Sequence, residues 1–158
     1  MKFIKRKNLT LIQKQEIFEL WNKEYPRKLK YNSVEELENY LQDLMDQNHI
    51  LLLDEKGKIK GWYFDFTREN ERWFAAIIDS EFQGRKFGSQ LIELAKQERS
   101  DLSGWVINSD NYKKVNGEKY KSPTGFYRKL GFEIQSGIIL KTDKITASKI
   151  RWSKNRFQ

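Results

Sequence analysis

The first third of the chain carries its hydrophobic residues at the spacing of helices. The residues from Ile17 to Trp21 place their apolar members on one helical face, and a second run from Leu37 to Met45 repeats this pattern. Each run follows a capping-box pattern, in which Thr10 or Ser33 is followed three residues later by Gln or Glu. The sequence therefore predicts that the chain opens with two helices.

The middle of the chain changes to short apolar or alternating runs, which favour strands. Three such runs, at residues 49–53, 58–67 and 72–79, are separated by polar turns and predict an antiparallel meander. Helical spacing returns over residues 87–99, and the next strand is expected at 104–108. A helix between two strands normally joins parallel neighbours, so we expect one parallel pair.

The last third begins with a polar loop over residues 109–121, which is either a lid over a binding site or a plain connector. A short helix follows from Ser122, a good N-cap, to Gly131, a good left-handed cap. Three short apolar runs then predict strands at residues 132–134, 138–140 and 149–152. The length of 158 residues suits one domain, which we expect to span residues 1–158.

The composition excludes several kinds of site. The chain has no cysteine, which excludes disulfides, a catalytic thiol and thiolate metal sites, and its one histidine, His49, excludes a multi-histidine metal site. We expect no metal. We expect His49 to end the second helix or open the first strand in a structural role, and a role as the general base is the alternative. No apolar stretch approaches the ~18 residues of a membrane span. We therefore expect a cytoplasmic protein without membrane contact.

The net charge of +8 lies mainly at the two ends of the chain, in residues 1–8 and 141–158. Such an excess favours polyanions in general, whereas a solvated surface is the simpler interpretation. The late strand with Lys149, Arg151 and Trp152 is expected to show an exposed basic face. Because the body of the chain is nearly neutral, we do not expect a nucleic-acid partner.

The turn between the third strand and the helix at residue 87 has the features of a phosphate site. A helix start offers unpaired amide hydrogens and partial positive charge. Gly84 and Gly88 allow close approach of an anion to the main chain, and Arg85 and Lys86 add positive charge. An ordinary strand-to-helix turn remains the alternative.

Tyr127 lies in the short late helix and has the chemistry of a proton donor. A phenol with a pKa near ~10 can protonate a leaving thiolate, whose own pKa is similar. The alternative is that Tyr127 only packs in the core beside Phe126 and Leu130.

Together, the two segments resemble the GNAT superfamily of N-acetyltransferases. That family carries Arg/Gln-x-x-Gly-x-Gly/Ala after a central strand and later a Phe-Tyr-x-x-Leu-Gly-Phe block. Here the first pattern appears as Gln83–Gly88 and the second as Phe126–Phe132. Lys86 departs from the family, because it stands at the first glycine of the motif.

The resemblance implies an α/β (α+β) fold with a mixed, mostly antiparallel central sheet, flanking helices and a splayed central strand pair. It also implies acetyl-CoA as cosubstrate, with its pantetheine arm paired to the strand end and its pyrophosphate held at the helix start. The residues expected at acetyl-CoA are Ile77, Ile78, Asp79, Gln83, Gly84, Arg85, Lys86, Phe87, Gly88, Ser89, Asn108 and Ser122.

The implied reaction is direct attack of an amine on the thioester, with Tyr127 as general acid to the CoA thiolate. The acceptor is expected to be a small-molecule or peptide amine, and Asp65, Glu71 and Glu118 are candidates for the general base. A non-catalytic CoA- or polyanion-binding module of the same fold is the alternative function. Both a monomer and a homodimer fit the sequence.

Overall fold

Seven strands join in one mixed sheet in the computed structural model, which describes residues 1–154. Arg156, part of the basic C-terminal segment, lies outside the described residues. The strands are β1 (Lys2–Arg6), β2 (Met45–Leu53), β3 (Ile59–Arg68), β4 (Glu71–Ile78), β5 (Asp101–Val106), β6 (Glu133–Lys141) and β7 (Thr146–Ser153). The helices are α1 (Leu11–Glu24), α2 (Val34–Gln42), α3 (Phe87–Gln97) and α4 (Thr124–Lys129), with single 3-10 turns η1 (Arg27–Leu29) and η2 (Ser80–Phe82).

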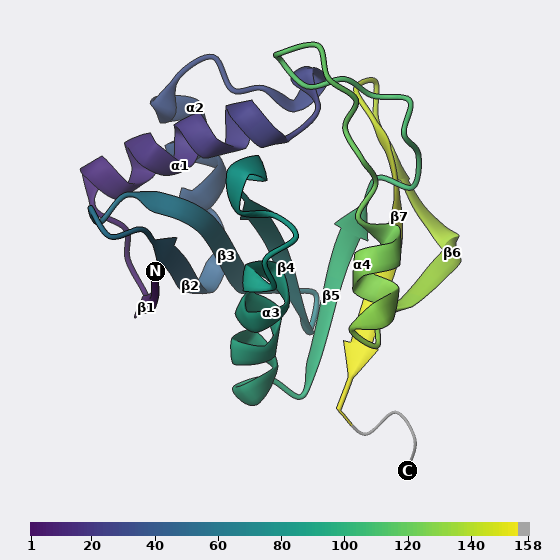
Figure 1. Ribbon diagram of the computed structural model, residues 1–158. Coiled ribbons are helices and arrows are strands. Elements are labelled where there is room, and N and C mark those ends of the chain that lie inside the picture. Colours follow the sequence, from purple (N-terminus) through teal and green to yellow (C-terminus); the bar gives the residue numbers. More distant parts are fainter. Residues whose placement is uncertain (155–158) are drawn as a thin grey trace.

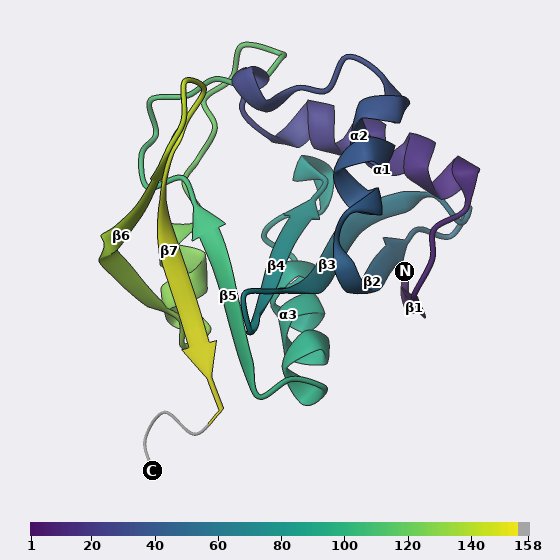
Figure 2. The same ribbon diagram turned by 180° about the vertical axis from the view of Figure 1, so that it is seen from behind.

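The strand order is β1-β2-β3-β4-β5-β7-β6, and β4 with β5 is the parallel pair among the described strands. Helices α1 and α2 cover one face of the sheet, and α3 and α4 lie on the other (Figures 1 and 2). Alternation along β3 supplies both cores, since Trp62 and Phe64 pack under α1 and α2 whereas Tyr63 packs under α3. The expected α/β fold is confirmed.

The strands β4 and β5 diverge, as the splayed pair requires. Among the described residues a single register pair, Trp73 with Ser103, joins them. The strands are close next to this pair, because a Cβ on Gly104 would lie 3.2 Å from the carbonyl oxygen of Phe74 and 2.9 Å from its ring. Among the described residues no further pair forms toward the carboxyl ends, where the two strands diverge (Figure 1).

The prediction that the chain opens with a helix is wrong, because strand β1 precedes α1. Residues Lys2–Arg6 pair with β2 at the sheet edge, where Phe3 and Ile4 are half-buried and Lys5 pairs with Glu98 at 2.6 Å. Charged residues are typical of edge strands, which pair with a neighbour on one side only and bury few apolar side chains. The five-residue strand is therefore too short and too basic for its pattern to show.

Several other boundaries move. Strand β2 starts at Met45, before the apolar run, and β5 starts at Asp101. The strands expected at 132–134 and 138–140 are one strand, β6, with an irregular register between Gln135 and Ile139. In each case polar residues take part in strand pairing, and hydrophobic periodicity cannot register them.

The helix caps follow the sequence in part. Thr10 forms the full capping box with Gln13, with the two bonds at 3.1 and 2.9 Å. Ser33 accepts from the amide of Glu36 at 3.4 Å. The N-cap of α4 is Pro123 and not Ser122, so that expectation is wrong by one residue, whereas Gly131 has the expected left-handed φ of 90°.

Candidate active site

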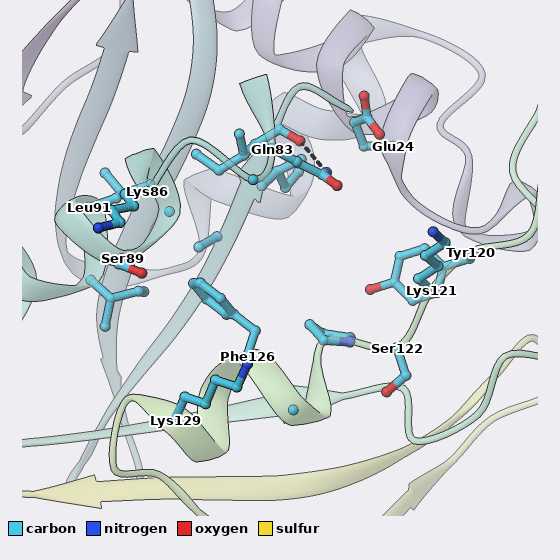
Figure 3. Close-up of a pocket in the computed structure, with 18 of the residues that line it drawn as sticks. Glu24, Gln83, Lys86, Ser89, Leu91, Tyr120, Lys121, Ser122, Phe126 and Lys129 are labelled. Atoms are coloured by element: carbon cyan, nitrogen blue, oxygen red, sulfur yellow. Dashed lines mark hydrogen bonds between the residues drawn. The ribbon is translucent and has the colours of Figure 1, made fainter. Parts of the chain in front are cut away.

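A cavity of about 650 Å³ opens at the carboxyl end of β4, where this strand diverges from β5. Its walls come from the end of β4, the turn before α3, the first turns of α3, the start of α4 and the end of the 109–121 loop. Figure 3 shows Phe126 and Lys129 of α4 on one side, Lys86 and Ser89 on another, and Glu24 at the edge formed by α1. The cavity thus lies where the splayed strands and the glycine-bearing turn meet.

Most of the residues expected at acetyl-CoA gather in this cavity. Those that line it are Ile77, Ile78, Gln83, Gly84, Lys86, Gly88, Ser89 and Ser122. The other expected residues, which lie next to these but outside the lining, are Asp79, Arg85, Phe87, Asn108 and Tyr127. The turn before α3 therefore supplies one wall of the cavity. Tyr127, the candidate acid, lies next to the cavity but not in its lining.

The start of α3 has the geometry of an anion site. Its N-cap, Lys86, gives no side-chain cap, and the first turn holds no acidic residue. The amides of Phe87, Gly88 and Ser89 come before the first intrahelical donor, Gln90, whose N–H bonds to the carbonyl of Lys86 at 3.0 Å. An anion at this end of the cavity would be stabilised by these amides and by the helix dipole.

Lys86 adopts a φ of 68°, in the left-handed region that glycine occupies at low cost. This left-handed backbone explains why the family motif has glycine at the position of Lys86. A lysine at this position has the cost of a left-handed backbone, which disfavours L-residues by about 1–2 kcal/mol.

Gly88 makes room for the wall contributed by α4. A Cβ at this position would lie 3.1 Å from the ring of Phe126 and 3.7 Å from Ile78. Any side chain here would push α3 away from α4 or close the space between them. The absence of a side chain therefore sets the width of the cavity at the start of α3.

Tyr127 is packed in the second core. Its side chain is 6% exposed, and its ring centroid lies 5.6 Å from that of Phe74, 5.0 Å from Phe126 and 5.3 Å from Phe132. Burial raises the pKa of Tyr127 above its ordinary value, with a further rise from nearby Tyr120. The phenol is therefore a neutral donor at physiological pH, but its pKa lies further from that of a thiol than the sequence argument assumed.

Two further tyrosines, Tyr25 and Tyr120, line the cavity itself, and sequence reasoning gave neither a role in catalysis. Their ring centroids are 6.4 Å apart. Burial raises the pKa of both phenols. The pKa of Tyr25 is raised further because a negative charge on Tyr25 would be repelled by a negative charge on Tyr120 or Tyr127. Three phenols thus cluster where the cavity meets α1 and the 109–121 loop.

Glu24 is a buried carboxylate in the cavity wall that sequence reasoning also missed. It is 4% exposed, and it accepts hydrogen bonds from the amide of Ser80 at 2.7 Å and from Nζ of Lys114 at 2.9 Å. The signal was present in the helix pattern, because Glu24 follows Leu20 and Trp21 by four and three residues. A charged residue on the apolar face of a helix marks a position with a polar partner or a function.

The carboxylates proposed as bases lie elsewhere. Asp65 is held by Arg72 and Arg99, the latter at 3.0 Å, and is outside the cavity lining. Glu71 accepts from Lys149 at 2.7 Å and from Arg151 at 3.1 Å. Burial favours a higher pKa of Glu71, but the hydrogen bonds from Lys149 and Ser103 and the charges of Lys149 and Arg151 together outweigh it, so the pKa of Glu71 is lowered.

These contacts correct two expectations. Asp65 and Glu71 belong to ion-pair clusters, and Glu118 is exposed on the 109–121 loop, outside the cavity lining. The late strand also lacks the exposed basic face, because β7 pairs with β5 and brings Lys149 and Arg151 over Glu71. The side chain of Lys149 is accordingly 11% exposed.

Within residues 1–154, no helix is long and apolar enough to cross a membrane. The same part of the chain contains no group of three or more His, Cys, Asp or Glu side chains placed to hold a metal ion.

Comparison with solved structures shows the same fold over the whole chain. An aminoglycoside 6′-N-acetyltransferase complexed with coenzyme A has a TM-score of 0.72 at 12% identity, covering 100% of this chain and 99% of its own. A phosphinothricin acetyltransferase from Sinorhizobium meliloti in complex with AcCoA has a TM-score of 0.65 at 13% identity, covering 97% and 89%. A chimeric spermidine N-acetyltransferase from Vibrio cholerae and a second source has 0.65 at 18% identity, covering 99% and 98%.

Sequence comparison gives the family. No curated protein sequence matches the chain. Residues 46–134, more than half of the chain, match the family described as acetyltransferase (GNAT) domain. This range begins in β2, includes the glycine-bearing turn and α4, and ends at the start of β6. The chain belongs to the GNAT acetyltransferase family.

Proposed function

We propose that this protein transfers the acetyl group of acetyl-CoA to the amino group of a small-molecule or peptide acceptor. The observation that carries the proposal is the cavity at the splayed ends of β4 and β5, which has an uncapped helix start at one end and a buried carboxylate at the other. One end suits a diphosphate and the other suits an amine. An acyl-pantetheine arm would run along the cavity between them.

The cofactor end offers two kinds of contact. Main-chain groups alternate between the two sides of β4, and the amide of Asp79 donates to the carbonyl of Lys60 next to β3 at 2.8 Å. The groups of Ile78, and not those of Ile77 or Asp79 as expected, therefore face the edge that β5 leaves unpaired, where they can pair with an extended amide-bearing chain. The amides at the start of α3 would hold the pyrophosphate, and the ammonium groups of Lys86 and Lys129 in the lining add positive charge. The residues present therefore fit CoA.

In the proposed reaction the neutral amine attacks the thioester carbonyl, so that a carbon–nitrogen bond forms and the carbon–sulfur bond breaks. The attacking nitrogen releases one proton to water, and the sulfur leaves as CoA thiol with a proton that Tyr127 donates and then regains from water. A backbone N–H near Ile78 would polarise the carbonyl oxygen. Tyr127 would donate its hydrogen to the departing sulfur. Because its pKa is raised, Tyr127 stays protonated at working pH and acts first as a hydrogen-bond donor to the developing thiolate.

The fold neighbours support an amine as acceptor. Their names describe acetyltransferases of aminoglycosides, spermidine and phosphinothricin. These proteins are 12% to 18% identical to this chain, so they support the class of reaction and not one acceptor. A panel of primary amines, amino sugars and peptides, assayed for CoA release, is the direct way to identify the acceptor.

The test of the proposed acid is Tyr127→Phe, with Tyr120→Phe as matched control. Loss of a general acid is expected to lower kcat by about 10²-fold, whereas the affinity for acetyl-CoA, measured by calorimetry, stays nearly the same. Tyr120→Phe keeps the ring that faces the cavity and should leave most of the turnover. Equal turnover in Tyr127→Phe and the parent would remove Tyr127 from this role.

The same measurements separate catalysis from binding alone. Acetyl-CoA uptake without CoA release for any amine in the panel would favour a non-catalytic binding module. A protein that takes up neither acetyl-CoA nor CoA would contradict the proposed function altogether.

A further inference from the structure

The carboxylate of Glu24 is already bound to a primary ammonium group in the free protein. Nζ of Lys114 lies 2.9 Å from one carboxylate oxygen, and the amide of Ser80 donates to the other oxygen at 2.7 Å. The side chains of Glu24 and Lys114 are 4% and 13% exposed, respectively. A buried carboxylate needs such a cation, because removing one partner leaves a charge that the interior cannot solvate.

Lys114 reaches this position from a surface segment, residues 109–121, which we call the strap. The strap crosses from the end of β5 toward α1 and η1 and returns to α4 (Figure 1). The carbonyl of Lys113 accepts from the amide of Arg27 at 2.7 Å, and the hydroxyl of Tyr112 accepts from the amide of Thr146 at 3.0 Å. Most strap residues are exposed.

A segment of this kind detaches more easily than a core element. Its ties to the rest of the fold are individual hydrogen bonds, one ion pair and two ring contacts, of Tyr120 with Tyr25 and of Tyr112 with Lys28. It contributes no residue to the two core clusters. Lys23 also approaches Glu24, at 3.8 Å, but it lies on α1 and is bonded to both oxygens of Asp79 at 3.0 Å. Of the two lysines, Lys114 is therefore the one that can withdraw.

The chemistry of the position names what can replace Lys114. An alkyl amine arrives at neutral pH as an ammonium ion with donors for a carboxylate. A primary alkylammonium with unbranched carbons next to nitrogen has the shape and charge of the end of a lysine side chain. It can take over the bond to Glu24, so that this carboxylate never stays unpaired.

We propose that Glu24 receives the ammonium group of the acceptor, and that Lys114 occupies this position until the acceptor displaces it. The bound ammonium then loses one proton to water, and the neutral amine that remains is the nucleophile. The inference rests on the proposed acetyltransferase function and adds the acceptor class, a primary alkyl amine. Lys114 is then an internal competitor of the acceptor. Competition of this kind raises the apparent dissociation constant by the inverse of the fraction of molecules in which Glu24 is accessible.

The test compares Lys114→Met, which removes the ammonium and keeps a flexible apolar stem, with Lys119→Met, an exposed lysine of the same strap. With n-butylamine as probe, Lys114→Met is expected to lower KM by about tenfold, and Lys119→Met to leave it unchanged. Lys114→Arg holds Glu24 more firmly and should raise KM. Shifts in opposite directions distinguish competition from a general loss of structure.

A binding measurement without turnover completes the experiment. Calorimetry should show n-butylammonium binding more tightly to Lys114→Met than to the parent, and n-butanol, which lacks the charge, should bind to neither. If Lys114→Met does not fold, Lys114→Gln is used in its place. Equal affinity of n-butylammonium for the parent and the Met or Gln and Arg variants would overturn the inference.

Acetyl-CoA is titrated into the same samples. Normal acetyl-CoA binding together with equal amine affinities defeats only the role of Lys114 and Glu24. Failure of acetyl-CoA to bind to the parent defeats the proposed function, so the two failures are distinguishable.

Discussion

His49 is the single histidine of the chain, and its surroundings fix its tautomer. It lies within β2, 1% exposed, where its Nδ1 accepts from Nε1–H of Trp62 at 3.0 Å. Its Nε2 lies 3.0 Å from Oε1 of Gln47, which makes Nε2 the protonated nitrogen. The expected structural role agrees with these contacts, although the residue lies inside a strand and not at its start.

Burial lowers the pKa of His49 to about 4, against a smaller opposite effect of Asp65. In the unfolded chain the pKa of histidine is near 6.5, so between pH 4 and pH 6.5 the unfolded chain binds more protons than the folded protein. The free energy of unfolding that is present above about pH 6.5 therefore decreases as the pH falls toward 4. We expect a loss of up to about 3 kcal/mol from this residue. Because the chain has one histidine, an NMR titration of its imidazole checks the pKa directly.

His49→Gln serves as the control, since its stability should change less over the same pH range. A midpoint near 6.5 in the folded protein would contradict the buried neutral imidazole.

At the scale of elements, the two capping patterns of the sequence have unequal strength. Thr10 and Gln13 exchange two bonds at the start of α1, whereas Ser33 accepts one bond of 3.4 Å at the start of α2. Thr10→Ala should therefore cost about 1 kcal/mol and Ser33→Ala clearly less. Urea unfolding of the two variants measures the difference, and equal losses would show that cap geometry does not set it.

The elements that the sequence predicts best have strong periodicity of their own. The strand at 72–79 and the helix at 87–99 agree with β4 and α3 to within two residues. The sequence did not predict strand β1, because this strand is stabilised by pairing with β2 and contains few apolar residues of its own. Long-range pairing likewise recruits the polar start of β2, which apolar patterning cannot reveal.

The same distinction applies to the two ends of the cavity. The wall at the start of α3 could be predicted because its lining residues lie in one short segment, residues 83–89, with a recognisable motif. The opposite end joins α1 to the strap, and Glu24 and Lys114 are separated by 90 residues. Nothing in either segment alone identifies the partner in the other, so the sequence did not reveal the contact between Glu24 and Lys114.

For the whole molecule, buried phenols dominate the response to alkaline pH. Burial raises the pKa of Tyr25, Tyr31, Tyr40, Tyr63, Tyr120 and Tyr127. The folded state therefore favours protonated phenols, and this stability is present below about pH 10 and is lost as the pH rises beyond it.

We expect the free energy of unfolding to decrease steeply from about pH 10 upward, by well over about 1 kcal/mol per pH unit where several phenols ionise together on unfolding. Chemical denaturation at a series of alkaline pH values measures this slope. A flat profile would mean that the phenols ionise as easily in the folded protein as in the unfolded chain.

Glu24 also connects two regions that a substrate pair would occupy separately. One carboxylate oxygen holds Lys114, and the other holds the amide of Ser80, in the turn that leads to α3. Any displacement of this carboxylate therefore alters the turn that precedes the helix start. A ligand bound at Glu24 would then change the affinity of the helix start of α3 for its own ligand. Thermodynamic reciprocity requires that each ligand change the binding of the other by the same factor.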